Sequence, residues 1–516
     1  MSAGGRPVGP VVVGLDVGTT GTKAVAFDLA SSWRRVVVGE YPLLEPVAGW
    51  QVQDPDVMVA VAADAVRECV AATDGAEVLA VSLCTAMHGL IALDGSGRAL
   101  TPLVTWADSR SSEEARSLRA SGQARDLHRV TGTPVHPMSP LTKLMWFRSH
   151  EPQTWARARW WVGLKDYLLL RLTGTVVTEL SSASATGMLD MFTRTWSPAA
   201  IELSGVSVDQ LPPVVSTTSV LELSRAAAGR FGLPAGTPVV TGAADGPLGN
   251  LGTGAIAPGV ASVSLGTSGA VRMVIPTPRV DEKGALFCYA LTEEAWVLGG
   301  AVSNGGVVIR WAGQSLAPEL RPGAGGSVDE QLLALAAQVP AGCDGLVMLP
   351  HLLAERAPLW DPELPGAYLG LRRVHTRGHL VRATVEGVCR QLGTIVDSLD
   401  RLSAITSVRV TGGAFRSALW RDVLAATLNR PLQVVGATEG SALGAAALAL
   451  LALGRATDLE EAVAQFAPPG GTGFSQVEPV AEQVAAYARI SSTVPDLIRS
   501  LAAVVPLFER TETGAP

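Results

Sequence analysis

Two hairpins with glycine-threonine tips, far apart in the chain, constrain its fold more than any other feature. Residues 14–28 read GLDVGTTGTKAVAFD and residues 261–274 read ASVSLGTSGAVRMV. In each, a β-forming apolar run leads through a Gly-Thr turn into a second β-forming run. Glycine lets the backbone approach a ligand closely, and successive backbone N–H groups form an anion-binding concavity. Two such tips predict two similar lobes that hold one polyphosphate between them, and ATP fits that chemistry.

The first tip differs from the phosphate-binding loop of P-loop proteins. That loop has the pattern G-x-x-x-x-G-K-[ST] and leads into a helix, whereas residues 18–23 lead into the β-forming run 24–27. An ordinary tight hairpin, with threonine present for its strand propensity, is the alternative at either tip. Asp16 argues against this alternative at the first tip, because a carboxylate beside a phosphate cradle requires Mg²⁺ or its water shell between them.

The composition is typical of a globular protein with more than one domain. A chain of 516 residues exceeds what one hydrophobic core supports. The net charge of −7 argues against a nucleic-acid-binding surface, and the longest small-apolar run, 442–454, is shorter than the ~20 residues that span a bilayer. Five scattered cysteines, and no apolar signal segment in residues 1–10, predict a cytoplasmic protein without disulfides.

Helical and β-forming segments alternate along the chain, which predicts a mixed α/β fold. In the first lobe, helical periodicity covers residues 56–72, 112–130 and 141–172. In the second lobe, we expect helices around 326–338, 376–404 and 417–429 and an alanine-rich helix over 440–454. A ligand cleft between the lobes is the expected arrangement.

Asp245 is the leading candidate for a catalytic group. It ends the apolar, small-residue run 238–244, just before the second lobe. At the mouth of a cleft its carboxylate could accept the proton of a substrate hydroxyl as that oxygen attacks the γ-phosphorus of ATP. The alternative is a helix N-cap, a common position for aspartate after a strand.

Two short segments carry side chains suited to sugar binding. Met87 and His88 follow an apolar strand, where the imidazole could bind a polyol hydroxyl or have only a structural role. Residues 105–110 combine Trp106, Asp108 and Arg110, and so offer ring packing together with bidentate polar contacts. An aspartate–arginine pair at the start of a helix is the alternative for this segment.

Two further segments resemble the signatures of a known family. Residues 137–147, PMSPLTKLMWF, resemble the first signature of the FGGY family of carbohydrate kinases. The segment GAYLGL at 366–371, followed by His379-Leu380 and residues 383–386, resembles the second signature. The remaining motifs follow in the family's order: DVGTTGTK, AMHG, WADSR, GAADG, LGTSG and TGGAFRSALWRDVLA. The resemblance covers about residues 10 to 455, nearly the whole chain.

The resemblance implies a two-lobe actin/hexokinase-like (ribonuclease H-like) α/β fold, with an ATP cleft between duplicated domains. It implies an N-terminal sugar-binding domain over 11–253 after a flexible segment 1–10, an ATP-binding domain over 254–480, and a C-terminal helix and tail over 481–516. It also implies roles for individual residues. Asp245 would be the catalytic base. The first phosphate region would comprise Asp16, Gly18, Thr19, Thr20 and Lys23, with Asp16 and Asp245 as Mg²⁺ ligands, and the second phosphate contact would comprise Gly266 and Thr267. The adenosine edge would comprise Gly412, Gly413 and Ser417, and the substrate contacts would be Met87, His88, Trp106, Asp108 and Arg110.

Within the family, several segments resemble the gluconate kinases, among them TGTPVHPMSPLTKLMW and FCYALTEEAWVLGGAVSNGGVVIRW. Xylulose kinases share the Met-His pair and the Trp-Asp-Arg segment but lack the combination of 136–140 with 303–306. A gluconate carboxylate needs a cationic or N–H-rich partner. Arg110, His136 and Lys165 are the candidate cations, and Asn304 could supply amide donors from the second lobe.

The resemblance therefore predicts ATP-dependent phosphorylation of D-gluconate with Mg²⁺ as cofactor. A xylulose kinase or another pentose or polyol kinase is the alternative within the family. A catalytically inactive sugar sensor of the same fold is the alternative from a different class. The expected partners are a small sugar or sugar acid and, as one assembly to consider, a second copy of the chain, without nucleic acid or membrane.

Overall fold

The computed structural model describes residues 5–323, 326–436, 440–466 and 474–509. These fall into two compact units. Unit 1 comprises residues 1–258, 274–298 and 438–472, and unit 2 comprises 259–273, 299–437 and 473–516. Residues 1–4 of the expected N-terminal segment and 510–516 of the expected tail lie outside the described residues.

Unit 1 is built on a six-stranded sheet with the order β13-β14-β5-β1-β2-β3. The first hairpin is confirmed: β1 (Val11–Val17) pairs antiparallel with β2 (Gly21–Asp28), which pairs antiparallel with β3 (Arg34–Glu40). On the other side, β5 (Val78–Thr85) runs parallel to β1, and β14 (Pro238–Ala244) runs parallel to β5. The edge strand β13 (Val220–Glu222) is antiparallel to β14.

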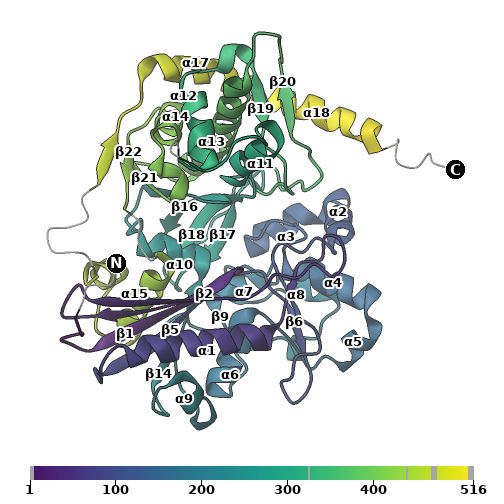
Figure 1. Cartoon of the computed structure of the whole chain (residues 1–516). Helices are drawn as coiled ribbons and strands as arrows, with labels where there is room; N and C mark the ends of the chain where they lie inside the picture. Colours follow the sequence, from purple (N-terminus) through teal and green to yellow (C-terminus); the bar gives the residue numbers. More distant parts are fainter. Residues whose placement is uncertain (1–4, 324–325, 437–439, 467–473, 510–516) are drawn as a thin grey trace. The chain divides into compact units, whose positions relative to one another are not determined.

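Helices cover both faces of this sheet (Figure 1). Alternate residues of β1, such as Val13 and Leu15, share a core with α1 (Pro55–Ala71). Gly14 points the other way, and a Cβ there would lie 2.1 Å from the Ala442 carbonyl oxygen of α15 (Gly440–Ala452). The alanine-rich α15 therefore packs in unit 1, against β1 and α10 (Asp245–Gly252), although its sequence falls within 254–480.

The second hairpin is also confirmed: β15 (Val260–Leu265) pairs antiparallel with β16 (Gly269–Ile275). Its sheet has the order β17-β18-β16-β15-β21-β22-β23, where β17 is Phe287–Ala290, β18 is Trp296–Val302 and β23 is Ser475–Val477. Both β21 (Ser407–Thr411) and β22 (Leu432–Val434) continue it in parallel. The order β16-β15-β21-β22 repeats β2-β1-β5-β14 of unit 1, so the expected duplication of one core unit is present in the strand order.

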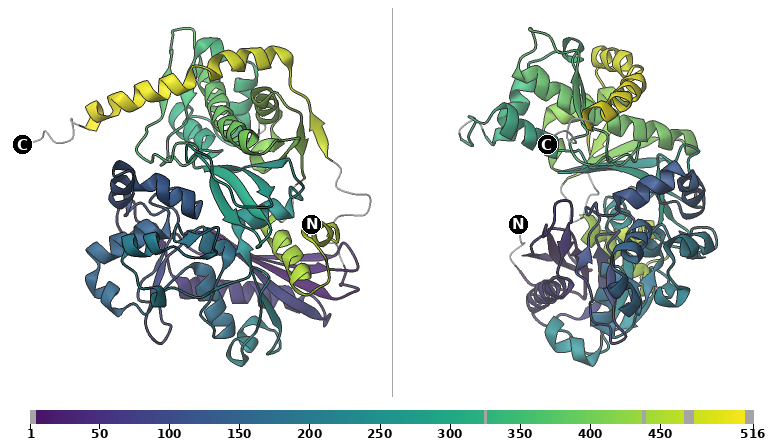
Figure 2. Two further views of the ribbon diagram at one scale, coloured as in Figure 1. Left: turned by 180° about the vertical axis from the view of Figure 1, so that it is seen from behind. Right: turned by 90° about the vertical axis from the view of Figure 1, so that its right-hand side faces the viewer.

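Three helices of unit 2 lie close to the predicted ranges: α12 (Val328–Ala337), α13 (Arg377–Leu402) and α14 (Ala418–Leu428). A further helix, α11 (Val307–Leu316), was not predicted. The segment after residue 480 forms α17 (Ala481–Ser491) and α18 (Val494–Glu509). In the left view of Figure 2, α18 extends beyond the rest of unit 2. None of the helices in the described ranges is long and apolar enough to cross a membrane.

Two predicted helices are interrupted. Residues 141–172 form α4 (Pro140–His150), α5 (Pro152–Arg157), the strand β8 (Trp160–Val162) and α6 (Leu164–Thr173). Pro152 ends the first helix because proline disfavours helical conformation in the preceding residue and has no N–H to donate. Residues 112–130 divide into α2 (Ser112–Ala120) and α3 (Gln123–Thr131), because Gly122 lies between them with φ of 81°.

Candidate active site

The carboxyl ends of three adjacent parallel strands bring the two candidate catalytic carboxylates together. On β1, Asp16 is aligned with Cys84 of β5, and Cys84 is aligned in turn with Ala243 of β14. Asp245 follows β14 directly, as the first residue of α10. Ligands of α/β sheets bind at the carboxyl ends of the strands, where loops diverge. Asp16 and Asp245 therefore lie where a reacting ligand is expected.

Asp16 lies in a strongly perturbed electrostatic environment. Burial raises its pKa to about 6, the negative charge of Asp245 acts in the same direction, and Lys23 and Lys165 act against it. The thiol of Cys84 donates to Oδ1 of Asp16 at 3.3 Å. Lys23 lies opposite Asp16 in the β1–β2 register. Because the charge of Asp245 affects the pKa of Asp16, the two carboxylates lie close enough to act on the same bound group.

Asp245 is not the N-cap of α10. That position belongs to Ala244, and Oδ1 of Asp245 accepts the N–H of Gly246 at 2.7 Å. The simple capping alternative for this aspartate is therefore not what the structure shows. A hydrogen bond to the carboxylate from the helix backbone fixes the side chain without using all of its acceptor capacity.

The first hairpin tip is held from outside by side chains of other segments. The N–H of Gly18 donates to the Gly21 carbonyl at 2.9 Å, which closes the turn. Tyr41 donates its hydroxyl to the Gly18 carbonyl at 2.6 Å, and Gln53 donates to the Thr19 carbonyl at 2.7 Å. Thr20 at the tip is exposed. A rigid tip with an exposed end is suited to receiving phosphate oxygens.

The donor set at this end of the sheet suits a divalent cation. Two carboxylates and the tip hydroxyls are hard oxygen donors, the type that Mg²⁺ prefers. Among the described residues there is no group of three or more histidine, cysteine or acidic side chains that would enclose a metal. This agrees with a cation that is held by one or two carboxylates together with the phosphates of a substrate.

The second tip, in unit 2, has an equally defined geometry. Gly266 and Thr267 are exposed, and their carbonyls accept the N–H groups of Gly306 (2.7 Å) and Val307 (3.1 Å) at the start of α11. Next to β15, Gly412 has φ of 111° and ψ of 166°, and a Cβ there would lie 2.3 Å from the Leu265 carbonyl oxygen. Only glycine fits this position, so the tip and the turn after β21 pack in direct contact.

The remaining residues expected at the adenosine edge follow that turn. Gly413 begins a 3₁₀ turn that extends to Arg416. Ser417 is the N-cap residue of α14, but its side chain makes no capping hydrogen bond. The structure thus brings Gly266, Gly412 and Gly413 together at one end of the unit 2 sheet, with Ser417 at the end of the turn.

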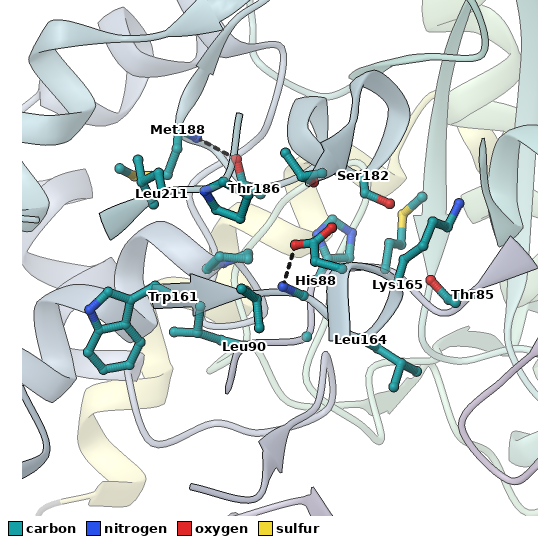
Figure 3. A pocket seen from close by; sticks show the side chains of 18 of the residues that line it. Thr85, His88, Leu90, Trp161, Leu164, Lys165, Ser182, Thr186, Met188 and Leu211 are labelled. Carbon is teal, nitrogen blue, oxygen red and sulfur yellow. Dashed lines mark hydrogen bonds between the residues drawn. The ribbon is translucent and has the colours of Figure 1, made fainter. Parts of the chain in front are cut away.

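His88 is held in an unusual backbone conformation beside a pocket of unit 1. Its φ is 67°, a left-handed value that costs free energy for a residue other than glycine. Its ring is buried, with Nδ1 2.8 Å from the Ala185 carbonyl oxygen and the ring edge-to-face with Tyr289. Met87, His88 and Lys165 line the same pocket (Figure 3). Such strain is typical of functional sites.

Asp108 and Arg110 are paired with each other, as the structural alternative for this segment expected. Both side chains are buried, and two hydrogen bonds of 2.8 Å join the guanidinium to the carboxylate. The carboxylate also accepts the N–H of Gln51, and the guanidinium lies 3.9 Å from the ring centre of Trp50. Their direct contact with a substrate stays a prediction. Trp106, two residues earlier, donates its indole N–H to the Thr19 hydroxyl at 2.9 Å and so joins this segment to the first tip.

The other candidates for a carboxylate partner also have protein partners. The Lys165 ammonium lies 3.0 Å from the Glu179 carboxylate, and both side chains are buried. Asn304, in unit 2, donates to Leu353 and Glu355 and accepts the N–H groups of Leu352 and Leu353. His136 is buried and accepts the Met138 N–H at Nδ1, which places the ring proton on Nε2. Their substrate contacts remain predictions.

Three residues without a predicted role, Lys143, Cys84 and Glu179, contact predicted site residues. Lys143 carried a detectable signal, because lysine is scarce in this chain and Lys143 lies within a motif. Cys84 and Glu179 carried none, since their relevance depends on partners from distant strands and helices.

The duplicated core, the two glycine-threonine tips and the carboxylates at the strand ends define a two-domain α/β protein of the actin/hexokinase-like class. The chain belongs to the FGGY family of carbohydrate kinases: residues 11–252 match the N-terminal domain of that family and residues 261–453 match its C-terminal domain. It is therefore a carbohydrate kinase, a transferase with a sugar acceptor, and kinases of this family use ATP and a divalent metal.

Two sequence relatives and two solved structures illustrate the similarity. The chain is 36% identical to the gluconokinase of Bacillus licheniformis over 451 residues, covering 86% of this chain and 88% of that one. It is 29% identical to the xylulose kinase of Bacillus subtilis over 463 residues, covering 88% and 91%. Gluconate kinase and xylulose kinase structures from Lactobacillus acidophilus are each 31% identical, with TM-scores of 0.89 and 0.90. Both alignments cover 97% of this chain, and they cover 99% and 100% of the respective structures.

Proposed function

We propose that the chain transfers the γ-phosphoryl group of ATP to the 6-hydroxyl of D-gluconate, giving 6-phospho-D-gluconate and ADP. The arrangement of Asp16 and Asp245 at adjacent strand ends is the observation that carries the phosphoryl transfer. The choice of gluconate is supported by the higher identity to a gluconokinase, 36%, than to a xylulose kinase, 29%. The solved structures do not favour either sugar, since both are 31% identical.

In the proposed reaction, Asp245 accepts the proton of the substrate hydroxyl as its oxygen forms a bond to the γ-phosphorus. The bond from that phosphorus to the β–γ bridging oxygen breaks, and ADP leaves. Phosphoryl transfer of this kind has a loose transition state in which charge spreads over the phosphoryl oxygens, so positioning and electrostatic stabilisation contribute most of the rate. A general base contributes a further ~10²–10⁴-fold.

The remaining candidate residues have binding roles in this proposal. Asp16, together with Asp245, would hold Mg²⁺ beside the first tip, where a bound cation would supply positive charge opposite the phosphates. Thr19 and Thr20 offer hydroxyl and backbone N–H groups to phosphate oxygens, as does Thr267 at the second tip. Gly412 and Gly413 let the backbone approach the nucleotide closely.

A coupled assay of ADP release over a panel of acceptors tests this proposal. We expect kcat/KM for D-gluconate to exceed the values for xylulose, ribulose and glycerol by at least tenfold, and EDTA to abolish turnover. A higher value for xylulose would replace the substrate assignment and keep the kinase. Binding of a sugar without ADP release from any acceptor, with Mg²⁺ present, would contradict the enzyme and favour the sugar sensor.

A further inference from the structure

Lys143 is a fully buried lysine in α4 that the proposed reaction leaves without a role. Its exposed fraction is 0%, and it lies beside the core residues Leu144 and Phe147. Burying a charged group among apolar side chains is costly unless hydrogen bonds compensate it.

The Lys143 ammonium is held by backbone carbonyls. Its Nζ donates to the carbonyl oxygens of His88 at 2.6 Å and Thr105 at 2.7 Å, and it lies 3.4 Å from that of Val104. An ammonium has three N–H groups, so three carbonyl acceptors match its donor capacity.

The carbonyls that bind Lys143 belong to the two segments that carry the predicted sugar contacts. One belongs to His88 itself, whose left-handed conformation needs support from its surroundings to persist. Another belongs to Thr105, which immediately precedes Trp106, the residue that donates to the Thr19 hydroxyl of the first tip. The two segments pair through backbone hydrogen bonds between Leu90 and Val104, and Lys143 adds a side-chain bond to each segment at the end nearer to His88 and Trp106.

We propose that Lys143 is a positioning residue that fixes the His88 and Trp106 segments relative to each other and so sets the affinity for the sugar. This inference rests on the proposed kinase activity but not on gluconate as its substrate. The ammonium does not touch the reacting atoms, because the three carbonyls occupy its donors. Its loss would therefore weaken sugar binding and leave nucleotide binding nearly unchanged.

The charged groups that act on Lys143 allow a second readout. Burial lowers the pKa of Lys143 to about 7, the Asp108 carboxylate acts against this shift, and the Arg110 guanidinium adds to it. The other titratable side chain on these segments is the His88 imidazole, although it is the His88 carbonyl that Lys143 binds. As pH rises through about 7, the ammonium loses one of its three N–H groups, and we expect the KM for the sugar to rise.

The test uses the full-length enzyme with the acceptor that the wild type prefers. Lys143→Met removes every donor, and Lys143→Gln retains two N–H groups. Leu141→Met is the matched control, because Leu141 is also buried on the same helix and its apolar side chain has no group that could hydrogen-bond to either sugar-binding segment. Sugar KM, ATP KM and kcat are measured between pH 6 and 9.

We expect Lys143→Met to raise the sugar KM by at least tenfold with ATP KM changed less than twofold, Lys143→Gln to be intermediate, and both to lose the alkaline rise. Equal changes in the two KM values, or a lower kcat with unchanged sugar KM, would overturn the positioning role. If Lys143→Met does not fold, Lys143→Gln alone decides, through the same comparison and the pH profile. An unexpected preferred sugar would contradict the gluconate assignment without affecting this inference.

Discussion

Replacing Asp245 by asparagine tests the catalytic assignment with little change of shape. The amide oxygen of Asn can still accept the Gly246 N–H that Asp245 accepts at 2.7 Å, so the start of α10 is preserved. The substitution removes the proton acceptor. We expect kcat to fall by more than a hundredfold, within the ~10²–10⁴-fold range of general-base catalysis, or about 3–5 kcal/mol of transition-state stabilisation. ATP binding should remain nearly intact, because no predicted adenosine contact changes.

The same variant has a second, independent effect on Asp16. Burial and the negative charge of Asp245 together raise the pKa of Asp16 to about 6. A protonated Asp16 cannot hold a cation, so kcat/KM of the wild type should fall as pH decreases through about 6. Neutralising Asp245 removes one of the two effects that raise this pKa. In Asp245→Asn, the acid limb of the residual activity should therefore move to lower pH.

Both effects are measured by ADP release over a range of ATP concentrations at saturating sugar between pH 5 and 8, which gives kcat and kcat/KM, with nucleotide affinity from equilibrium titration. Asp74→Asn is the matched control: it removes one aspartate charge at an exposed position whose φ of 52° asparagine tolerates. Turnover within tenfold of the wild type in Asp245→Asn would refute the role of Asp245 as base. An unchanged acid limb would refute the electrostatic coupling to Asp16.

Two further substitutions test other parts of the structure. Gly412→Ala should lower the free energy of unfolding by about 1–3 kcal/mol and raise ATP KM. The reason is that the backbone conformation at Gly412 is restricted to glycine and a Cβ there would lie 2.3 Å from the Leu265 carbonyl oxygen. Unchanged thermal unfolding and ATP KM would contradict this prediction. Burial raises the pKa of Asp166 to about 6, so its protonation stabilises the folded state below about pH 4 and this contribution is lost as pH rises through about 6. Asp166→Asn should therefore lose less stability than the wild type between pH 4 and 7 in urea unfolding, and parallel curves would contradict the assignment.

Local sequence patterns were sufficient to predict the two hairpins and most helices of unit 2. The strand–turn–strand pattern of residues 14–28 is self-contained, because the β1–β2 register follows from the turn and the alternation of side chains. By contrast, the packing of α15 against β1 depends on Gly14 accepting a close backbone approach from residue 442, which no local pattern encodes. Pro152 could have predicted the interruption of the helix expected over 141–172, but the apolar periodicity of that segment favoured one continuous helix.

The candidate site shows the same division between local and long-range information. Asp16 and Asp245 could be singled out because Asp16 lies two residues before the first Gly-Thr tip and Asp245 directly follows a strand of apolar and small residues. The pairing of Asp108 with Arg110 was one of two interpretations that the sequence left open; the structure shows the pair, with both side chains buried, and substrate contact stays a prediction. The carbonyl contacts of Lys143 could not be predicted, because they depend on two loops that meet only in the folded unit.

The way these buried cations are partnered bears on the choice of substrate. Arg110 is neutralised by Asp108 and Lys165 by Glu179, each through direct contact between buried charges. The direct acceptors of Lys143 are instead neutral carbonyls, so its positive charge is not cancelled by a contacting carboxylate.

In a chain of net charge −7, the charge of Lys143 is a local source of positive potential near the sugar-binding segments. We expect a sugar acid to gain from that potential and a neutral ketose not to. Because burial lowers the pKa of Lys143 to about 7, the ratio of kcat/KM for gluconate to that for xylulose should fall as pH rises through that value. A ratio that is constant from pH 6 to 9 would show that the potential comes from groups other than Lys143.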